Sequence, residues 1–582
     1  MKKALVLLLT LAMIMTLLAG CGSSSSNNSS APAEEAEEAE EPAEEPAEEP
    51  AEEPAEEPAE EPAEEPAEEP AEEATSGLCT VVEDSDIVVL NYSDISTMCP
   101  ANMTQMSESV FSDLCYESLC DFNDDDMSIK WVLANGVDIS EDGKTYVFHL
   151  REGVKFTGGE DWNAEAAKKN FDFLLDPNNV TAKAWMFTCV ESVEATGEYE
   201  LTIKLKEPYV AFLSILASYP GFMSPALLEK GNEVAAHEID GTGQYKLVDY
   251  TSGEKAVFEL KRDYWGYDPE LCGGTALVEP DTGFNSITLK PVSEEATRMA
   301  MLMNNEADIV NSLTVRNVPT IEAAGNTTFT ILGGMIGYLY FNCQKEPLTD
   351  PKVRLAIAYA IDTQQLNETV YGGMNNQCDS MISPSISGYK SEFVIQQDLE
   401  KSKQLLAEAG YPDGGFTLVA YEENDTTDIQ RGQFIQQQLE QVGIKVELNP
   451  MEGGVLAEKV DSYSGDPKEI GYDIYIRGWS TDTFDSDEML GRFTTEQFMP
   501  AGSNSSFYSN PRVDELCALA KKEIDETKRN EYYAEVQDIM WEELPADPLL
   551  VNGWIGAYGQ RIAYVRYASD GNFDWTTAKY KG

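Results

Sequence analysis

A short polar segment in the C-terminal third carries three side chains that could bind a small charged molecule. Arg477, Trp479 and Asp482 lie in the sequence RGWSTD. A carboxylate can hold a cation, a guanidinium can hold a carboxylate through two parallel hydrogen bonds, and an indole can cover an apolar group. The loop follows a strand-like segment at 472–477, and α/β proteins place ligands at such strand ends. The segment is therefore a candidate ligand-binding loop.

Each of these side chains also has an ordinary structural interpretation. Asp482 could be a solvated or helix-capping residue, since the chain has 104 acidic residues. Trp479 could belong to a hydrophobic core, and Arg477 could be a surface arginine. Asp485 and Asp487 follow closely and could share the role of Asp482. Residue types alone therefore leave both interpretations open at this loop.

Catalytic and metal-binding arrangements are hard to assemble from this sequence. The two histidines, His149 and His237, are too few for a His-rich zinc site or a multi-His iron site, and neither lies near the candidate loop. The segment from Gly241 to Gly243 lacks the third glycine of a dinucleotide-binding loop, and no P-loop lysine is present. We therefore expect a binding protein that is not an enzyme, without catalytic residues, a metal site or a cofactor.

The net charge of the chain argues against a nucleic-acid partner. The 582 residues carry a formal charge of -64, and residues 31–73 contribute 22 Glu with no basic residue. From position 74 onward, 82 acidic and 38 basic residues still leave a charge of -44. A surface this negative repels a phosphate backbone.

The N-terminus has the features of an exported lipoprotein. Lys2 and Lys3 precede an apolar run that ends in Leu-Ala-Gly-Cys21, which resembles the bacterial lipobox. We expect residues 1–20 to be a signal peptide and Cys21 to carry the lipid that holds the protein at the outer face of the cell membrane. An uncleaved anchor is the alternative, but its apolar run is shorter than the roughly 20 residues of a membrane span.

A repetitive acidic segment separates the N-terminus from the rest of the chain. Residues 21–30 form a Ser/Asn linker, and residues 31–75 form a disordered spacer with eight copies of Pro-Ala-Glu-Glu from Pro42 to Glu73. A proline every fourth residue prevents a continuous helix, and like charges extend the chain. The alternative is a Glu-rich tail that binds cations or basic partners.

Beyond Cys21 the chain has an odd number of cysteines, so they cannot all pair with one another. They are Cys79, Cys99, Cys115, Cys120, Cys189, Cys272, Cys343, Cys378 and Cys517. An exported protein can form disulfides. A local bridge among Cys99, Cys115 and Cys120 is plausible, because these three lie close in the sequence.

Alternating strand and helix patterns predict an α/β fold. Strand-like segments occur at 145–150, 200–206, 416–421, 444–448 and 472–477, and helical spacing occurs at 164–175, 398–409, 428–442 and 453–463. Gly410 and Gly443 follow two of these helices at the position that ends a helix. The alternation favours a largely parallel sheet with covered faces.

Several segments resemble, in the same order, family 5 of the bacterial extracellular solute-binding proteins, the peptide- and nickel-binding receptors of ABC importers. They are EDGKTYVFHLREGVKF at 141–156, LKEPYVAFLSILA at 205–217, MSPALLEKG at 223–231, GTGQYKLVDYTSGEKAVFELKRDYWG at 241–266, YLYFNCQKEPLTDPKVRLAIAYAID at 338–362, LEKSKQLLAEAGYPDGG at 399–415 and YDIYIRGWSTD at 472–482. The resemblance implies a two-lobed, hinged α/β fold of the type II periplasmic-binding-protein class, with an extra subdomain in the N-terminal lobe.

The resemblance also implies how the chain divides between the lobes. Lobe 1 would comprise 76–115, the extra subdomain at 116–225, a second segment at 226–335 and a C-terminal return at 546–582, while lobe 2 would comprise 336–545. A ligand would be enclosed when the lobes close.

The family pattern suggests roles for particular residues. Asp482 stands where peptide-binding members hold the ligand's amine. Tyr338, Tyr340 and Asn342 alternate along a strand, share one face and become hinge or cleft-edge candidates.

The resemblance also suggests ligand contacts from lobe 1. Asn102 and Thr104 lie in a loop that lobe 1 would present to the ligand. No residue that would bind the ligand's terminal carboxylate is evident.

The function that the resemblance implies is the capture of short peptides for a membrane permease and its ATPase, by a monomeric lipoprotein. Main-chain hydrogen bonds would give affinity with broad specificity. Two alternatives remain open: a non-peptide solute, such as a metal chelate or an oligosaccharide, and a surface lipoprotein that senses peptides.

Overall fold

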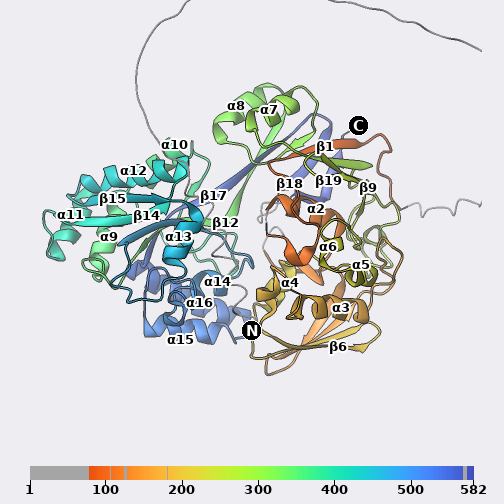
Figure 1. Cartoon of the computed structure of the whole chain (residues 1–582), viewed down its shortest axis with the longest axis horizontal. Coiled ribbons are helices and arrows are strands. Elements are labelled where there is room, and N and C mark those ends of the chain that lie inside the picture. Colours follow the sequence, from red (N-terminus) through yellow and green to blue (C-terminus); the bar gives the residue numbers. More distant parts are fainter. Residues whose placement is uncertain (1–77, 105, 124–126, 180, 568–572, 582) are drawn as a thin grey trace, which may run out of the picture. The chain divides into compact units, whose positions relative to one another are not determined.

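The computed structural model describes residues 78–104, 106–123, 127–179, 181–567 and 573–581 (Figure 1). The expected signal peptide at 1–20, the expected lipidation site Cys21 with its linker, and the expected spacer at 31–75 lie outside these residues. Within the part that the structure describes, no helix is both long enough and apolar enough to cross a membrane.

The described chain forms two lobes, each built around its own hydrophobic core. The core of lobe 1 takes its side chains from residues 81–309 and 562–578. The core of lobe 2 takes its side chains from residues 336–551. A third, smaller core includes Leu302 and Ile555. The chain therefore leaves lobe 1, builds lobe 2 and returns to lobe 1.

One sheet of eleven strands runs through both lobes. In spatial order it contains β15 (Lys445–Met451), β14 (Thr417–Glu423), β16 (Ile474–Trp479), β12 (Thr327–Phe341), β17 (Ala546–Tyr558), β11 (Ile309–Val310), β1 (Asp86–Asn91), β10 (Ser286–Pro291), β9 (Lys255–Leu260) and β8 (Tyr245–Thr251), while β13 (Asn376–Gln377) pairs with β17. The long strands β12 and β17 stand between the two ends of the sheet (Figure 1).

β12 and β17 connect the lobes as an antiparallel pair. Phe329 and Ile331 of β12 pack against the lobe 1 core, and Ile336 lies in the lobe 2 core. The register is interrupted between these parts, because residues 333–335 stand opposite a single residue of β17. An interruption of this kind bends a strand locally, so the crossing point is the natural hinge.

The remaining strands belong to lobe 1. They are the four-stranded antiparallel sheet of β4 (Ala134–Ile139), β5 (Thr145–Leu150), β7 (Glu200–Leu205) and β6 (Val190–Gly197), the pair β2 (Cys120–Phe122) and β3 (Ile129–Trp131), and the pair β18 (Ile562–Tyr567) and β19 (Phe573–Tyr580). The four-stranded sheet falls within 116–225, the range predicted for an extra subdomain. The boundaries of all the predicted segments stay a prediction.

Short helices cover the sheets of lobe 1. They are α2 (Met106–Cys115), α3 (Ala164–Leu175), α4 (Phe212–Ala217), α5 (Pro225–Lys230), α6 (Asn232–Ala235), α7 (Glu295–Met303) and α8 (Val318–Ala323), with 3-10 turns at Pro100–Asn102, Ala184–Phe187, Trp265–Tyr267 and Val315–Asn317. The Asn163 side chain caps α3 by accepting the Ala166 N–H at 3.0 Å.

Lobe 2 has its own set of helices. They are α9 (Pro351–Ala360), α10 (Thr363–Val370), α11 (Leu399–Glu408), α12 (Thr426–Glu440), α13 (Gly453–Val460), α14 (Ser486–Gly491), α15 (Pro511–Ala520) and α16 (Glu526–Glu543), with a 3-10 turn at Thr495–Gln497. Asp398 and Asp425 cap α11 and α12. Gly410 and Gly443, which follow these helices, adopt φ of 93° and 81°, so the predicted helix ends are confirmed.

Two expectations are corrected. The large sheet is mixed and not largely parallel, because β12 and β17 carry the chain to lobe 2 and back in opposite directions. Parallel pairing is confined to β1 with β10 and β11, and to β14 with β15 and β16. No bridge forms among Cys99, Cys115 and Cys120, which are buried as free thiols. Their surroundings differ, since the Cys120 thiol donates to the Leu213 carbonyl at 3.6 Å.

Candidate ligand-binding site

A cavity of about 320 Å³ lies between the two lobes. Its aromatic lining residues are Tyr116, Phe122, Tyr219, Tyr264, Phe484, Trp554, Phe573 and Trp575. Phe122 of lobe 1 and Phe484 of lobe 2 meet edge to face with their ring centroids 5.9 Å apart. The volume is near the lower end of the roughly 300–1,000 Å³ that ligand cavities span. The cavity therefore suits a small molecule held between apolar walls.

The lobe 2 side of the cavity is the loop between β16 and α14. Ser480, Thr481 and Asp482 of this loop line the cavity. β16 ends at Trp479, and α14 begins at Ser486. The loop therefore occupies the position after a sheet strand that the sequence predicts for ligand contacts.

The carboxylate of the half-buried Glu488 holds this loop in place. It accepts the backbone N–H groups of Asp482 and Thr483, each at 3.0 Å, and the hydroxyls of Thr481 and Thr483, each at 2.8 Å. Burial raises the pKa of Glu488, and the hydrogen bonds from the loop oppose that rise. The loop conformation thus depends on one acceptor group inside α14.

Asp482 presents its carboxylate to the cavity without a partner. Its side chain is exposed, and among the described residues the carboxylate has no hydrogen bond or ion pair. The other lining carboxylates are engaged: Glu117 accepts from the Trp265 indole at 2.9 Å, and Asp574 accepts from the Thr577 hydroxyl at 2.9 Å. Asp482 is therefore the lining carboxylate best placed to accept a ligand cation.

Two lysines bring positive charge to the lobe 1 side of the cavity. Lys130 lies on β3 and Lys183 precedes the 3-10 turn at Ala184–Phe187. Within the part of the chain that the structure describes, neither ammonium group has a hydrogen bond or an ion pair. Neither lysine stands in a motif that would have marked it in the sequence. An anionic group of a ligand would find its counter-charge here.

The predicted residues of the lobe 1 loop have different positions. Thr104 lines the cavity. Asn102 lies outside the lining residues, where its amide donates to Asn232 at 3.2 Å and accepts the Ala182 N–H at 3.1 Å. Asn102 therefore connects the loop to neighbouring segments and does not face the cavity.

Tyr338, Tyr340 and Asn342 are buried in lobe 2 and do not line the cavity. The Tyr338 hydroxyl donates to the Met381 carbonyl at 2.7 Å, and the Asn342 amide donates to the Pro467 carbonyl at 2.9 Å. All three lie on the part of β12 beyond the crossing point, or directly after it, so the structure places them in core packing. The crossing point itself is at Gly333 and Gly334.

Arg477 and Trp479 also lie outside the lining residues. Arg477 pairs with Asp461 at 3.3 Å and donates to the Tyr475 hydroxyl at 3.0 Å. The Trp479 ring centroid lies 3.5 Å from the guanidinium carbon of Arg492. Both side chains therefore contact other groups of lobe 2.

Asp485 and Asp487 have structural partners instead of a place in the cavity. Asp485 is the N-cap of α14 and forms a buried ion pair with Arg529, whose Nη1 lies 2.9 Å away. Asp487 accepts from the Tyr533 hydroxyl at 3.1 Å, and burial raises its pKa. Neither is available to share the role of Asp482.

Several residues that shape or line the site carried no usable signal in the sequence. Glu488 stands three residues after the N-cap Asp485, a spacing typical of a helix start, and that pattern locates α14 without indicating what Glu488 binds. Phe122 and Trp575 come from distant segments, and only the fold brings them together.

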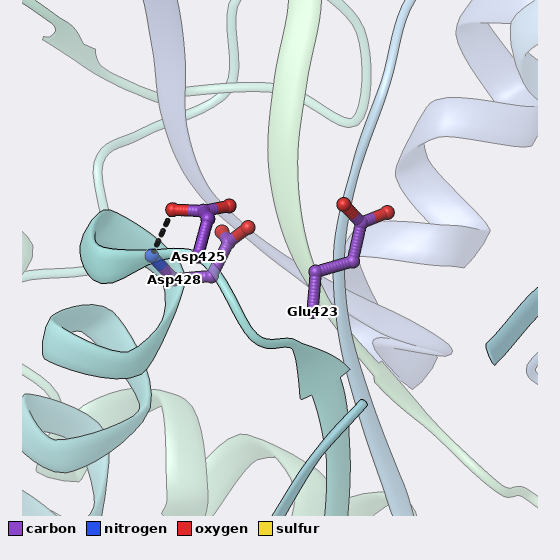
Figure 2. Close-up of side chains that lie close together, drawn as sticks. All are labelled: Glu423, Asp425 and Asp428. Atoms are coloured by element: carbon purple, nitrogen blue, oxygen red, sulfur yellow. Dashed lines mark hydrogen bonds between the residues drawn. The ribbon is translucent and has the colours of Figure 1, made fainter. Parts of the chain in front are cut away.

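A separate group of acids gathers at the start of α12. Figure 2 shows Glu423 at the end of β14, Asp425 at the N-cap of α12 and Asp428 in its first turn, with carboxylate oxygens within 4.8 Å of one another. The Asp425 carboxylate accepts the Asp428 N–H at 3.1 Å, and Asp428 pairs with Arg431. Helix capping and this ion pair account for two of the three acids.

Comparison with known proteins decides the family. A sequence model of the bacterial extracellular solute-binding proteins, family 5 (middle region), matches residues 128–500. The chain belongs to this family. Family 5 proteins are substrate-binding proteins and not enzymes, and their extracellular setting places this chain outside the cytoplasm.

Curated relatives cover most of the chain. The glutathione-binding protein GsiB of Salmonella typhi is 32% identical over 502 residues, which is 85% of this chain and 94% of that protein. GsiB of Escherichia coli O157:H7 is 32% identical over 498 residues, with the same coverage of both chains. The family 5 assignment therefore applies well beyond the residues that the family model matches.

Solved structures show the same fold. HbpA2 from Haemophilus parasuis is 21% identical and matches with a TM-score of 0.76, covering 85% of this chain and 100% of that one. The periplasmic binding protein DppA from Helicobacter pylori, in complex with the peptide STSA, is 24% identical and matches with a TM-score of 0.66, covering 85% and 98%. The two-lobed type II periplasmic-binding-protein fold predicted from the sequence is confirmed.

Proposed function

We propose that this chain is the substrate-binding lipoprotein of an ABC importer, which captures short peptides between its lobes and delivers them to a membrane permease powered by an ATPase. The observation that carries the proposal is the unpaired carboxylate of Asp482 in a cavity with aromatic walls. A peptide's α-amino group is a cation at neutral pH, and a carboxylate in a closed cleft is its natural partner.

The rest of the cavity fits the other parts of a peptide. Lys130 and Lys183 supply positive charge for a carboxylate, which is the contact that the sequence left without a candidate. Thr104 adds a hydroxyl, and the aromatic walls can cover apolar side chains. A cavity of about 320 Å³ favours peptides of a few residues over long ones.

The comparisons support this ligand class. Similar proteins are named for binding glutathione and dipeptides, both of which join an amine to at least one carboxylate. These names support the proposal that this chain is a receptor for small peptides.

The sequence supports the membrane attachment that the proposal includes. Cys21 would carry the lipid, and the repeats that follow would act as a spacer between the membrane and a monomeric binding domain. A lipid on Cys21 keeps a binding protein near its permease without a membrane-spanning helix.

Native mass spectrometry of the purified protein, before and after denaturing release, tests the proposed ligand class. Closed-cleft receptors retain what they capture, so we expect released masses that correspond to short peptides. A single non-peptide mass or a metal complex would overturn the peptide assignment. If the spectrum shows no ligand, titration with a defined dipeptide and tripeptide set decides, and failure of every member to bind would also overturn it.

A further inference from the structure

Arg492 is a buried cation that forms no ion pair with a described carboxylate. Its side chain follows α14 in lobe 2 and is 6% exposed. Nη2 donates to the Ser503 carbonyl at 3.1 Å, while Nη1 is closed to solvent and has no partner. Among the described residues no carboxylate forms an ion pair with Arg492. A buried guanidinium with an unused N–H donor is energetically costly, so the binding of a hydrogen-bond acceptor beside it is strongly favourable.

Two neighbouring side chains offer further unused donors. The guanidinium carbon of Arg492 lies 3.5 Å from the ring centroid of Trp479 and 5.4 Å from that of Tyr340. The Trp479 indole nitrogen and the Tyr340 hydroxyl are both closed to solvent, and neither has a hydrogen-bond partner in the described part of the chain. Burial raises the pKa of Tyr340, so its hydroxyl keeps its proton and can donate. Three unused donor groups therefore belong to Arg492 and to the two aromatic residues that it contacts.

The charged and titratable groups around this cluster are already engaged. Arg477 pairs with Asp461, and the Tyr338 hydroxyl donates to the Met381 carbonyl. Glu488, the carboxylate whose charge acts on Arg492, accepts from the Asp482 loop. A water molecule at the cluster would accept hydrogen bonds from these donors, but its own two O–H groups would also need acceptors. An occupant that only accepts fits better, and anions are such occupants.

We propose that lobe 2 binds a small monovalent anion, a halide or a carboxylate group, between Arg492, Tyr340 and Trp479. Arg477 and Trp479 are partly exposed and form the entrance, whereas Arg492 and Tyr340 form the buried floor. The site lies outside the residues that line the ligand cavity. Since Trp479 leads directly into Ser480–Asp482, occupancy of the site would fix the start of the ligand loop.

Bromide is the probe that tests the proposal directly. Crystals of the protein grown in sodium bromide, with and without a bound dipeptide, are measured at the bromine absorption edge. We expect an anomalous peak within hydrogen-bond distance of all three side chains. If bromide remains at the site when the dipeptide is bound, the natural occupant is an inorganic anion. If the carboxylate of the dipeptide replaces the bromide, the natural occupant is the carboxylate of the transported ligand. A site without anomalous signal or carboxylate density in both crystals overturns the proposal.

A solution measurement keeps the test independent of crystals and of Arg492 variants that do not fold. The melting temperature is followed against bromide at constant ionic strength, with gluconate as the balancing anion, and gives an apparent bromide affinity. Tyr340→Phe removes one donor to a charged group, and we expect the affinity to fall about tenfold or more. Arg512→Gln is the matched control, because Arg512 is an exposed arginine paired with Glu535 on the same lobe. Equal bromide affinity in Tyr340→Phe and wild type would contradict the proposed geometry.

Discussion

The carboxylate of Glu488 accepts the backbone N–H of Asp482 at 3.0 Å, so one acid positions the residue that carries another. Glu488 is half-buried and its carboxylate is hydrogen-bonded to the loop, whereas the Asp482 side chain is exposed to the cavity. The two carboxylates thus have different roles at this site: that of Glu488 fixes the loop conformation, and that of Asp482 remains available for a cation.

Removing the acceptor capacity of Glu488 should weaken ligand binding, although Glu488 does not line the ligand cavity. In Glu488→Gln an amide N–H group replaces one carboxylate oxygen and faces the N–H and hydroxyl donors of the loop. We expect a loss of about 1–3 kcal/mol, since buried donors lose their acceptor. Calorimetric titration of the variant and the wild type with a peptide that the wild type binds measures this loss of binding free energy. Glu496→Gln, an exposed glutamate on the same lobe, is the control, and equal affinities for both variants would show that the loop holds its shape without Glu488.

Neutralising Asp482 should remove the counter-charge of the ligand's amine. For Asp482→Asn we expect a loss of about 2–5 kcal/mol in peptide affinity, because the ammonium group would be enclosed without a carboxylate. That loss corresponds to about 30-fold to several-thousand-fold in Kd. Asp263→Asn makes the same charge change at an exposed position outside the cavity and should bind like wild type. An N-acetylated peptide should lose the same amount with wild-type protein; full affinity of that peptide would exclude an amine contact.

A side chain at Gly334 should disturb both the hinge and the ligand loop. A Cβ there would lie 2.9 Å from Thr481 Cγ2 and 3.1 Å from Phe484 Cε1. We expect Gly334→Ala to cost about 1–3 kcal/mol by overpacking, and to weaken peptide binding because the loop must shift. Gly337→Ala lies on the same strand, where the nearest atom to a Cβ is 3.9 Å away. Urea unfolding and peptide titration of the pair give the comparison, and indistinguishable variants would refute the steric reasoning.

The stability of the protein should depend on Asp547 between pH 4 and pH 8. Burial raises the pKa of this β17 carboxyl from 3.8 to about 7. The folded state therefore keeps a proton that the unfolded state loses near pH 4, so this group costs stability increasingly as the pH rises to about 7.

Asp547→Asn isolates this effect from the titration of other groups. We expect the variant to exceed wild type in free energy of unfolding by roughly 2 kcal/mol or more at pH 8, and to match it near pH 4. Denaturant unfolding of both proteins at the two pH values measures this difference. A variant that is less stable than wild type at pH 8 would show that the charged carboxylate has a partner in the folded state.

Local patterns predicted much of the secondary structure. The six residues of β5 and the twelve of α3 agree with the predicted segments, because alternation and helical spacing reflect which face of an element is buried. Caps such as Asp398 and glycines such as Gly443 act over one turn, so their effect is visible in sequence. The mixed sheet was not predicted, because strand direction depends on contacts between segments hundreds of residues apart.

The sequence by itself determined the family, the α/β elements and the loop that contains Asp482. It favoured Asp482 as the amine-binding residue but left Asp485 and Asp487 able to share that role. Tertiary structure distinguishes these residues: Asp485 is buried against Arg529, while Asp482 lines the cavity and has no partner among the described residues. It also placed Lys130, Lys183 and the aromatic walls around the same space. The physical reason is that burial and ion pairing depend on distance in space, and β12 and β17 bring these distant segments together.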